Sequence, residues 1–491
     1  MNEIRHRLYR ADQVRELDRR AIEDHGIAGY DLMQRAGAAV FAALRARWPE
    51  ARRVLVCCGG GNNGGDGYVI ARLAREAGLE AEVLAQSDPE RLAGDAKRAA
   101  DAWRTAGGTV VREAASADPG DADVIVDALL GTGLDRPVRD DYAELIGRLN
   151  GSGRPVVAVD VPSGVQADTG AVLGTAVRAA LTVSFIGRKR GLETGAAPDH
   201  VGCLLFDDLD VPGAVHQGLA ADARRLAAAD VAALLPPRSA TTHKGALGHV
   251  LVVGGDHGMP GACLLAARAA LTAGSGLVSV ATRAAHAVSL AAGLPEAMWA
   301  DGEDGDTLKA LIERADVLAL GPGLGRSEWS QAVWRGALAA DRPLVVDADA
   351  LNLLAAEPSD RGNWLLTPHP GEAARLLGTD VGEVQRDRFE AVRAIARRFD
   401  AVVVLKGAGS LVADPEGRVD LCPFGNPAMA TAGMGDALTG IVASLIGQGL
   451  APFDAAGAGA VLHARAGDRA AAERRSILAG ELIDALPAVL P

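Results

Sequence analysis

Residues 53–74 read RVLVCCGGGNNGGDGYVIARLA, and the order of residue types predicts a strand, a glycine-rich loop and a helix. The strand is expected at Arg53–Cys57 and the helix from about Asp66 to Ala77. Further strand-like runs follow at Ala81–Ala85, Val124–Val126, Val156–Val159 and Leu181–Phe185, with helical stretches between several of them. This alternation is typical of a doubly wound parallel sheet. Residues 12–48, ahead of the first strand, have apolar residues at helical spacing and are expected to form a helix.

The second half of the chain repeats this alternation. Strands are expected at Val250–Val253, Leu277–Ala281, Val317–Leu320, Pro343–Val346 and Val402–Leu405, and helices at Gly261–Ala273 and Met434–Ile446. Residues 207–221, between the halves, show no clear periodicity, and 491 residues are too many for one ordinary core. We therefore predict two α/β domains, residues 1–215 and residues 216–491.

The charge balance argues against broad classes of partner. The formal net charge of −13 disfavours general binding to nucleic acid or to an anionic membrane, so an anionic ligand requires a local positive site. Arginine is the usual cation of this chain, and a lysine inside a motif therefore carries more weight. The five lysines are Lys97, Lys189, Lys244, Lys309 and Lys406.

Cysteine usage and the N-terminal segment predict a cytoplasmic protein. Five cysteines with no Cys-x-x-Cys pair are too few for a disulfide scaffold, so reduced thiols are expected. Residues 1–10 are charged and lack the apolar core of a signal peptide. No uninterrupted apolar run approaches the roughly 18 residues that mark a membrane helix.

The glycine loop of the first half matches the G-x-G-x-x-G dinucleotide fingerprint at residues 59–64, but this match alone is weak. Asp66 would place a carboxylate where a pyrophosphate needs bare N–H groups, and no clear acidic residue follows about twenty positions on. Asp66 could instead be a helix cap. The neighbouring pair Asn62 and Asn63 offers amide oxygens, which suit a simple cation.

Polar residues also follow two other strands of the first half. Asp127 comes after Val124–Val126, and Asp160 and Ser163 come after Val156–Val159. Each of these residues alone could be a cap or a turn residue. Because ligands of open α/β sheets bind beyond the carboxyl ends of the strands, the matched strand ends favour a common site.

These motifs together resemble the NAD(P)H-hydrate epimerase domain, a Rossmann-like three-layer αβα sandwich, over about residues 10–210. The resemblance rests on the segments at 61–67, 127–133, 160–164 and 185–192. It implies that a potassium ion is held by Asn63, Asp127 and Ser163. It implies that the damaged nicotinamide nucleotide is held by Asn62, Asn63, Gly64, Gly65, Asp66, Gly131, Thr132, Gly133, Leu134, Asp135, Arg136, Pro137 and Asp160.

The implied substrate suggests a mechanism. The hydrate carries a hydroxyl on the carbon next to the ring nitrogen, and that nitrogen can expel the hydroxyl once an acid protonates it. Water can then return on the other face. We expect Asp160 to act first as acid and then as base.

The second half contains an anion-binding sequence, although no P-loop motif occurs in the chain. Residues 426–436 read NPAMATAGMGD and lead into an apolar helix, whose first N–H groups are free to bind a phosphate. Asp436 would repel that phosphate, but it could take the proton of a hydroxyl that attacks phosphorus. The alternative is that Asp436 only caps the helix.

Three other segments could support this site. Lys406–Ser410 follows a strand and could contact nucleotide phosphates, or could be a tight turn with a solvated lysine. His369 lies between two prolines, which fits a binding role or a structural one equally well. Residues 321–325 (GPGLG) form another glycine loop at a strand end.

Together these segments resemble the ribokinase-like family, in its ADP-dependent NAD(P)H-hydrate dehydratase branch, over about residues 225–488. Residues 242–245, 252–255, 259–262 and 367–372 are particular to that branch. The resemblance implies phosphorylation of the hydrate hydroxyl by ADP, loss of phosphate with AMP as co-product, a need for Mg²⁺, and a homo-oligomer, in particular a tetramer. It implies hydrate contacts from Ala262, Gly323, His369 and Asp436, and nucleotide contacts from Lys406, Gly407, Ala408, Gly409, Ser410 and Gly435.

The sequence leaves three alternatives open. The second domain could be a ribokinase-like kinase for another small alcohol, and the first could be a binding module without activity. The two halves also contain similar sequences: a strand preceded by Arg-Pro ends at Asp160 in one half and at Asp347 in the other. Gene duplication would explain this, but we favour convergence of buried strands on similar sequences.

Overall fold

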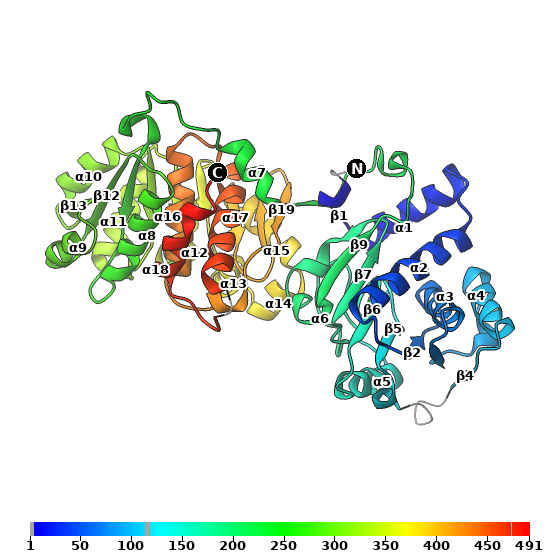
Figure 1. The fold of residues 1–491 in the computed structure, drawn as a ribbon. Helices are drawn as coiled ribbons and strands as arrows, with labels where there is room; N and C mark the ends of the chain where they lie inside the picture. The colour runs from blue at the N-terminus through cyan, green and yellow to red at the C-terminus, as the bar shows by residue number, and fades with distance from the viewer. Residues whose placement is uncertain (1–3, 113–117, 473) are drawn as a thin grey trace. The chain divides into compact units, whose positions relative to one another are not determined.

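A computed structural model describes residues 4–112, 118–472 and 474–491. The chain divides into two compact units, Met1–Ala223 and Arg224–Pro491, against a predicted division at residue 215 (Figure 1). Leu209, Val211 and Val215 are buried in the core of the first unit. The aperiodic segment at the end of the first half thus completes that core.

The first unit is built on a parallel sheet of seven strands in the order β4-β3-β2-β5-β6-β7-β9. These strands are β2 (Arg53–Cys58), β3 (Glu80–Ala85), β4 (Val110–Val111), β5 (Val124–Ala128), β6 (Val156–Val159), β7 (Leu181–Phe185) and β9 (Cys203–Asp207). Two short strands outside this sheet, β1 (Arg7–Tyr9) and β8 (Arg188–Lys189), pair in parallel.

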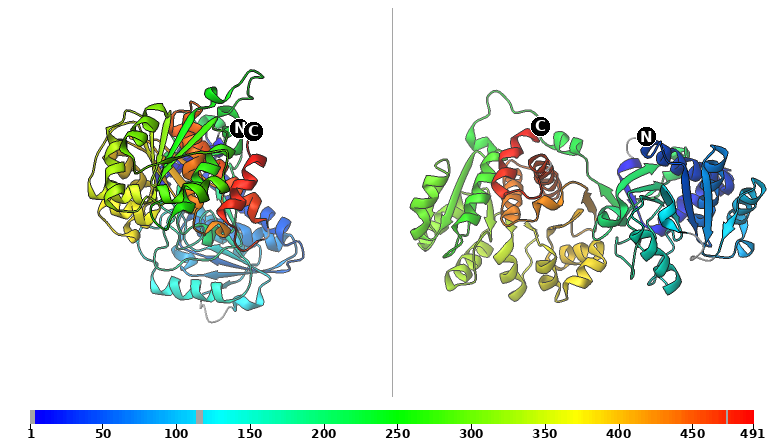
Figure 2. Two further views of the ribbon diagram at one scale, coloured as in Figure 1. Left: turned by 90° about the vertical axis from the view of Figure 1, so that its left-hand side faces the viewer. Right: turned by 60° about the horizontal axis from the view of Figure 1, so that its bottom comes forward.

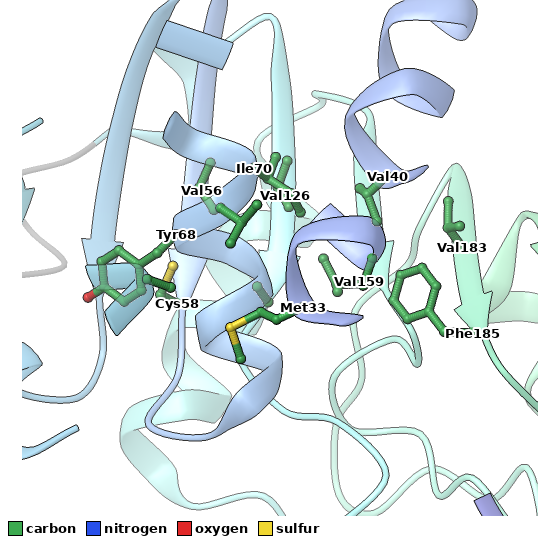
Figure 3. Packing of buried hydrophobic residues seen from close by; sticks show 14 of the residues in the cluster. Met33, Val40, Val56, Cys58, Tyr68, Ile70, Val126, Val159, Val183 and Phe185 are labelled. Atoms are coloured by element: carbon green, nitrogen blue, oxygen red, sulfur yellow. The ribbon is translucent and has the colours of Figure 1, made fainter. Parts of the chain in front are cut away.

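Helices cover both faces of this sheet. They are α1 (Ala11–Arg19), α2 (Gly29–Arg47), α3 (Asn62–Glu76), α4 (Gly94–Thr105), α5 (Asp140–Gly151) and α6 (Pro198–Val201). Figure 3 shows one core, in which Val56 and Cys58 of β2 meet side chains of α2 and α3. The alternate residues Leu55 and Cys57 pack with α5 on the opposite face. The predicted three-layer arrangement is confirmed.

The predicted single helix over residues 12–48 is wrong. The chain forms α1, a π-helical turn at Arg20–Asp24 and then α2, which begins only at Gly29. Gly26 separates these elements with φ +69°, a left-handed conformation that glycine adopts without steric cost. Helical periodicity on both sides of the break concealed it.

The helix of the glycine-rich segment starts earlier than predicted. α3 begins at Asn62, with Gly61 as its N-cap, so residues 62–66 form its first turns instead of a loop. The glycines permit this early start because α3 packs closely against β2 and β5, where a side chain would not fit. A Cβ atom on Gly67 would lie 2.7 Å from both Ala128 Cβ and Cys58 Sγ.

The second unit is built on a mixed sheet in the order β13-β12-β11-β14-β15-β16-β17-β18-β19. Its strands are β11 (His249–Val253), β12 (Leu277–Thr282), β13 (Met298–Asp301), β14 (Val317–Leu320), β15 (Leu344–Val346), β16 (Trp364–Leu366), β17 (Val402–Leu405), β18 (Ser410–Ala413) and β19 (Val419–Cys422). β18 runs antiparallel to both of its neighbours, and the other pairs are parallel. β10 (Ala223–Arg225) pairs in parallel with β19.

Helices cover this second sheet as well (Figure 1 and Figure 2). They are α7 (Ala228–Leu234), α8 (Pro260–Thr272), α9 (Ala287–Gly293), α10 (Gly305–Arg314), α11 (Glu328–Ala339), α12 (Ala348–Ala356), α13 (Pro370–Leu377), α14 (Val381–Arg386), α15 (Arg388–Phe399), α16 (Met434–Gly447), α17 (Pro452–Ala471) and α18 (Ala479–Ala485). α8 and α16 pack on each other and on the central strands through Ala266, Ala270 and Val442. These small side chains allow close packing of helix on helix and sheet.

Two predictions from composition meet the structure here. Among the described residues, no helix is long and apolar enough to cross a membrane. The five cysteines are free thiols, and four of them are buried: Cys57, Cys58, Cys263 and Cys422. Burial raises the pKa of the Cys57 and Cys263 thiols, the latter to about 11, so both are neutral at ordinary pH.

Candidate functional sites

A cavity of about 620 Å³ opens in the first unit at the carboxyl ends of the sheet strands. Its lining includes both asparagines of the glycine-rich segment, the whole loop after β5 and the residue that follows β6. Of the residues predicted to bind nucleotide, those on the lining are Asn62, Asn63, Asp66, Gly131, Thr132, Gly133, Leu134, Asp135, Arg136, Pro137 and Asp160. The structure therefore brings together three segments that are far apart in the sequence.

Gly64 and Gly65 are not on that lining. Both are buried, and a Cβ atom on Gly64 would lie 2.2 Å from the Gly59 carbonyl oxygen. A Cβ atom on Gly65 would lie 2.6 Å from Met33 Cε. Their visible role is to let α3 start close to the loop and to α2.

Asp127 and Ser163 meet as predicted. Ser163 donates to Asp127 through its hydroxyl, at 2.6 Å, and through its backbone N–H, at 2.8 Å. Asp127 is fully buried, and burial raises its pKa to about 6 despite these bonds. Asn63 lies nearby against Gly131, and its buried Nδ2 atom has no hydrogen-bond partner among the described residues.

Asp160 is held by a lysine that the sequence analysis did not assign to the site. It adopts a left-handed conformation with φ +66°, which is strained for a residue other than glycine. Its Oδ1 atom accepts from Ser184 Oγ at 3.2 Å, from the Phe185 N–H at 3.1 Å and from Lys189 Nζ. Lys189 is only 2% exposed. The scarcity of lysines in this chain was the signal that could have found it.

Asp66 is not a helix cap, because Gly61 occupies the N-cap position of α3. It faces the cavity from the second turn, and its carboxyl group makes no hydrogen bond with another described residue. Burial, together with the charges of Asp160 and Asp18, raises the pKa of Asp66 well above its usual value. Asp18, on α1, also lines the cavity, and burial raises its pKa to about 6.

In the second unit, the sequence GMGD forms the start of α16. Gly433 is its N-cap, in a left-handed conformation with φ +89°. His463 of α17 is hydrogen-bonded to the Met434 carbonyl at 2.9 Å and holds this turn in place. The first N–H groups of α16 thus have the arrangement that suits an anion.

Asp436 lies in the first turn of α16 but does not cap it. Its carboxyl group makes no hydrogen bond with another described residue. Burial raises the pKa of Asp436 to about 7, and the nearby Asp347 charge adds to this shift while Lys406 opposes it. A carboxyl group that titrates near neutral pH and is free of protein partners can accept a proton from a substrate hydroxyl.

Lys406 opens the turn after β17, but its side chain is mostly buried, with 19% exposed, and is not free in solvent. Its Nζ atom donates to Asp347 Oδ1 at 2.8 Å and lies 3.8 Å from Glu372 Oε2. Asp347 Oδ2 in turn accepts from Thr439 Oγ1 of α16 at 2.8 Å. A Cβ atom on Gly435 would lie 3.1 Å from Lys406 Nζ, so the lysine lies directly under the start of α16.

Asp347 and Glu372 were not predicted as site residues. The similar sequences of the two halves were a signal for Asp347, because Asp160 and Asp347 both follow a strand and both form an ion pair with a lysine. Burial alone would raise the pKa of Asp347, but Lys406 and Thr439 hold it below its usual value. Burial raises the pKa of Glu372 to about 7.

His369 is the N-cap of α13. Its Nδ1 atom accepts from the N–H groups of Gly371 and Glu372, at 3.0 and 3.4 Å. Glu372 Oε2 accepts from the His369 N–H at 2.8 Å, which closes a reciprocal capping box. Burial and the Lys406 charge lower the pKa of His369, so the ring is neutral at pH 7 with its proton on Nε2.

The remaining predicted contacts fall into two places. Gly323, with φ +60°, lies beside α8: a Cβ atom there would be 3.1 Å from Ala262 Cβ. Residues 406–409 form the turn between the antiparallel strands β17 and β18, and Ser410 opens β18. A Cβ atom on Gly407 would lie 3.1 Å from the buried Arg388 guanidinium, so a side chain there would have to displace it.

Two family models match this chain, one described as YjeF-related protein N-terminus over residues 29–191 and one as NAD(P)H-hydrate dehydratase over residues 250–488. The bifunctional NAD(P)H-hydrate repair enzyme of Coxiella burnetii is 48% identical over 479 residues, 97% of this chain and 97% of the relative. That of Escherichia coli K12 is 43% identical over 489 residues, 99% of this chain and 94% of the relative. The chain belongs to the family of bifunctional NAD(P)H-hydrate repair enzymes.

The fold of the second unit of this repair enzyme has a match among solved structures. A ribokinase-like superfamily protein from Enterococcus faecalis V583 superposes with a TM-score of 0.52 and 26% identity, covering 56% of this chain and 98% of that protein. The predicted ribokinase-like domain and the predicted family are therefore confirmed.

Proposed function

We propose that this enzyme repairs hydrated NADH and NADPH in two steps. The first unit interconverts the R and S hydrates, and the second dehydrates the S hydrate with an adenine nucleotide. The observation that carries this proposal is the relationship over nearly the whole chain to bifunctional repair enzymes, with both units present. The first unit is tested by following interconversion of the epimers without nucleotide. The second is tested by following the nucleotide-dependent return of the reduced-nicotinamide absorbance.

In the dehydration step, Asp436 takes the proton of the hydrate hydroxyl as that oxygen attacks the terminal phosphorus of the nucleotide. The first N–H groups of α16 oppose the charge of the transferred group, and Lys406 adds positive charge beneath them. The ring nitrogen then expels orthophosphate from the phosphorylated carbon, and loss of a proton from the adjacent carbon restores the C=C bond of the reduced nicotinamide. Positioning and charge thus account for the catalysis.

The dehydration rate depends on pH through Asp436. The carboxylate form is the active base, and its pKa is about 7, so kcat/KM should rise as the pH increases from 6 to 8. Glu372 titrates in the same range, with Asp347, Asp349 and Lys406 nearby. A pH profile of wild type against Glu372→Gln distinguishes the two groups. A rate that falls over this range would contradict a base at Asp436.

The group around Asp127 fits a potassium ion. Asp127 is a buried carboxyl group without a cationic partner among the described residues, and the amide of Asn63 has an unpartnered nitrogen. If that amide is turned over, it presents its oxygen toward the same region. Asp127, Ser163 and Asn63 would then hold the ion with hard oxygen ligands. When bound, the ion supplies positive charge that fixes the loop after β5.

Potassium should stabilise the first unit. We expect 100 mM KCl to raise its thermal unfolding midpoint above that in 100 mM choline chloride at pH 8, because the ion binds only the folded state and offsets the buried Asp127 charge. Asp127→Asn should abolish this difference. Equal midpoints of wild type in the two salts would contradict the site.

The magnesium ion proposed for the second unit would need ligands from outside the protein. Among the described residues, no group of three or more His, Cys, Asp or Glu side chains could hold a metal. Mg²⁺ usually binds through one or two carboxylates and the substrate phosphates, so we expect it to enter with the nucleotide. We further propose ADP as the donor and a tetrameric assembly, which parallel assays with ADP and ATP and sedimentation velocity would test.

A kinase for another small alcohol is the alternative for the second unit. The two functions leave different products: the repair reaction releases NAD(P)H and orthophosphate in equal amounts, whereas a kinase accumulates a stable phosphorylated alcohol. Measurement of both products from the S hydrate separates them.

A further inference from the structure

The sequence pointed to Asp160 as the acid of epimerisation, but its surroundings argue against that role. Its Oδ1 atom accepts three donors, one of which is the buried ammonium of Lys189. Lys189 Nζ also donates to the Phe185 carbonyl at 3.0 Å, which fixes the ammonium in place. With three donors on Oδ1, one of them an ammonium, this carboxyl group is arranged to accept hydrogen bonds and not to donate a proton.

Asp66 has the opposite surroundings. It reaches the same cavity from α3 and is mostly buried there. Its carboxyl group makes no hydrogen bond with another described residue. The charged groups that face it are Asp18 on α1, Asp160 after β6 and Lys189 of β8. Arg15 on α1 and Asp95 on α4 also line the cavity. Two carboxylates thus oppose a further negative charge on Asp66.

We propose that Asp66 is the catalytic acid that protonates the leaving hydroxyl of the hydrate, and that Asp160 remains a carboxylate which stabilises the cationic ring. This inference rests on the proposed epimerisation and assigns the two roles within it.

Expulsion of the hydroxyl uses the proton of Asp66 and the lone pair of the ring nitrogen. The carbon–oxygen bond breaks with its electron pair going to oxygen, the Asp66 proton completes a water molecule, and the ring nitrogen lone pair forms a C=N bond. The ring then carries one positive charge, which the nearby carboxylate of Asp160 on the cavity lining stabilises. A second water adds to the opposite face and releases its proton to solvent, and Asp66 takes up a proton from solvent before the next turnover.

The protonation state of Asp66 supports this assignment. Burial and the neighbouring carboxylates raise its pKa well above the usual value, so the acid form persists toward neutral pH. General acid catalysis requires that form. Epimerisation should therefore slow as the pH rises through the pKa of Asp66, the reverse of the dependence expected for dehydration.

The test uses the full-length enzyme with purified R hydrate, without nucleotide, in water enriched in oxygen-18. For wild type we expect solvent oxygen in each S hydrate molecule formed. Asp66→Asn should lower the rate above the uncatalysed background about 100-fold or more and remove the decline at high pH. Dehydration of S hydrate by the same variant is the control for folding of the second unit. A thermal unfolding midpoint close to that of wild type is the control for folding of the first unit.

Asp18→Asn is the matched variant within the same cavity. It removes one negative charge facing Asp66 and should move the high-pH decline to lower pH, while the rate at pH 6 changes less than tenfold. Wild-type activity in a folded Asp66→Asn variant, a decline that Asp18→Asn does not move, or retention of the original oxygen would each overturn the proposal. Absence of any wild-type interconversion above background would instead refute the epimerase function itself.

Discussion

Asp436→Asn should lower kcat for nucleotide-dependent dehydration about 100- to 10,000-fold, the usual contribution of a positioned acid or base. The amide is nearly the same size as the carboxyl group but cannot accept the proton of the attacking hydroxyl. The carboxyl group makes no hydrogen bond that the substitution would break, so the start of α16 should remain folded. The measurement is single-turnover recovery of the reduced-nicotinamide absorbance from S hydrate.

The same Asp436 variant should retain the epimerase activity of wild type, because that reaction belongs to the cavity of the first unit. Binding of the nucleotide should change little, since the backbone N–H groups of α16 are unaltered. Loss of both activities in a folded variant would contradict two separate sites. Unchanged dehydration would show that another group accepts the proton.

Lys406→Met should destabilise the second unit by about 3–5 kcal/mol, the usual cost of removing one partner from a buried ion pair. The substitution leaves Asp347 buried: its carboxylate still accepts from Thr439 but has lost the ammonium that balanced its charge. Urea unfolding followed by tryptophan fluorescence would measure this loss, because Trp334 and Trp364 are buried in that unit.

Asp347→Asn combined with Lys406→Met provides the control. The double variant removes both charges, so it should recover most of the stability that the lysine substitution loses. If the double variant is as unstable as Lys406→Met, packing of the lysine side chain and not its charge accounts for the effect. Asp436 should also titrate at higher pH in Lys406→Met, because Lys406 lowers its pKa in wild type.

Much of the fold could be predicted because buried parallel strands are short apolar runs. The strands at Val156–Val159, Leu181–Phe185 and Val402–Leu405 have the predicted bounds. Short strands such as β16 (Trp364–Leu366) and the antiparallel pair β18 and β19 were not predicted, because their pairing depends on tertiary contacts. The break at Gly26 was missed for a different reason, because helical periodicity continues on both sides of it.

The site could be predicted only where a motif marks it. Asn62, Asn63 and Asp66 of the glycine-rich segment and the residues of the loop after β5 line one cavity, as expected from strand ends. Lys189, Asp18, Asp347 and Glu372 carry no local motif and are brought in by the folding of distant elements. Asp66 could not be separated from a helix cap until the structure showed that α3 begins at Asn62.

One chain with both units should return both hydrate epimers to the reduced nucleotide. The most direct measurement is the yield of NADH from an equal mixture of R and S hydrates with ADP, K⁺ and Mg²⁺, followed until it stops. We predict recovery of all the hydrate, with one orthophosphate released per NADH, at a rate faster than uncatalysed epimerisation allows. Recovery that halts when half of the hydrate is consumed, or NADH formed without orthophosphate, would contradict the account.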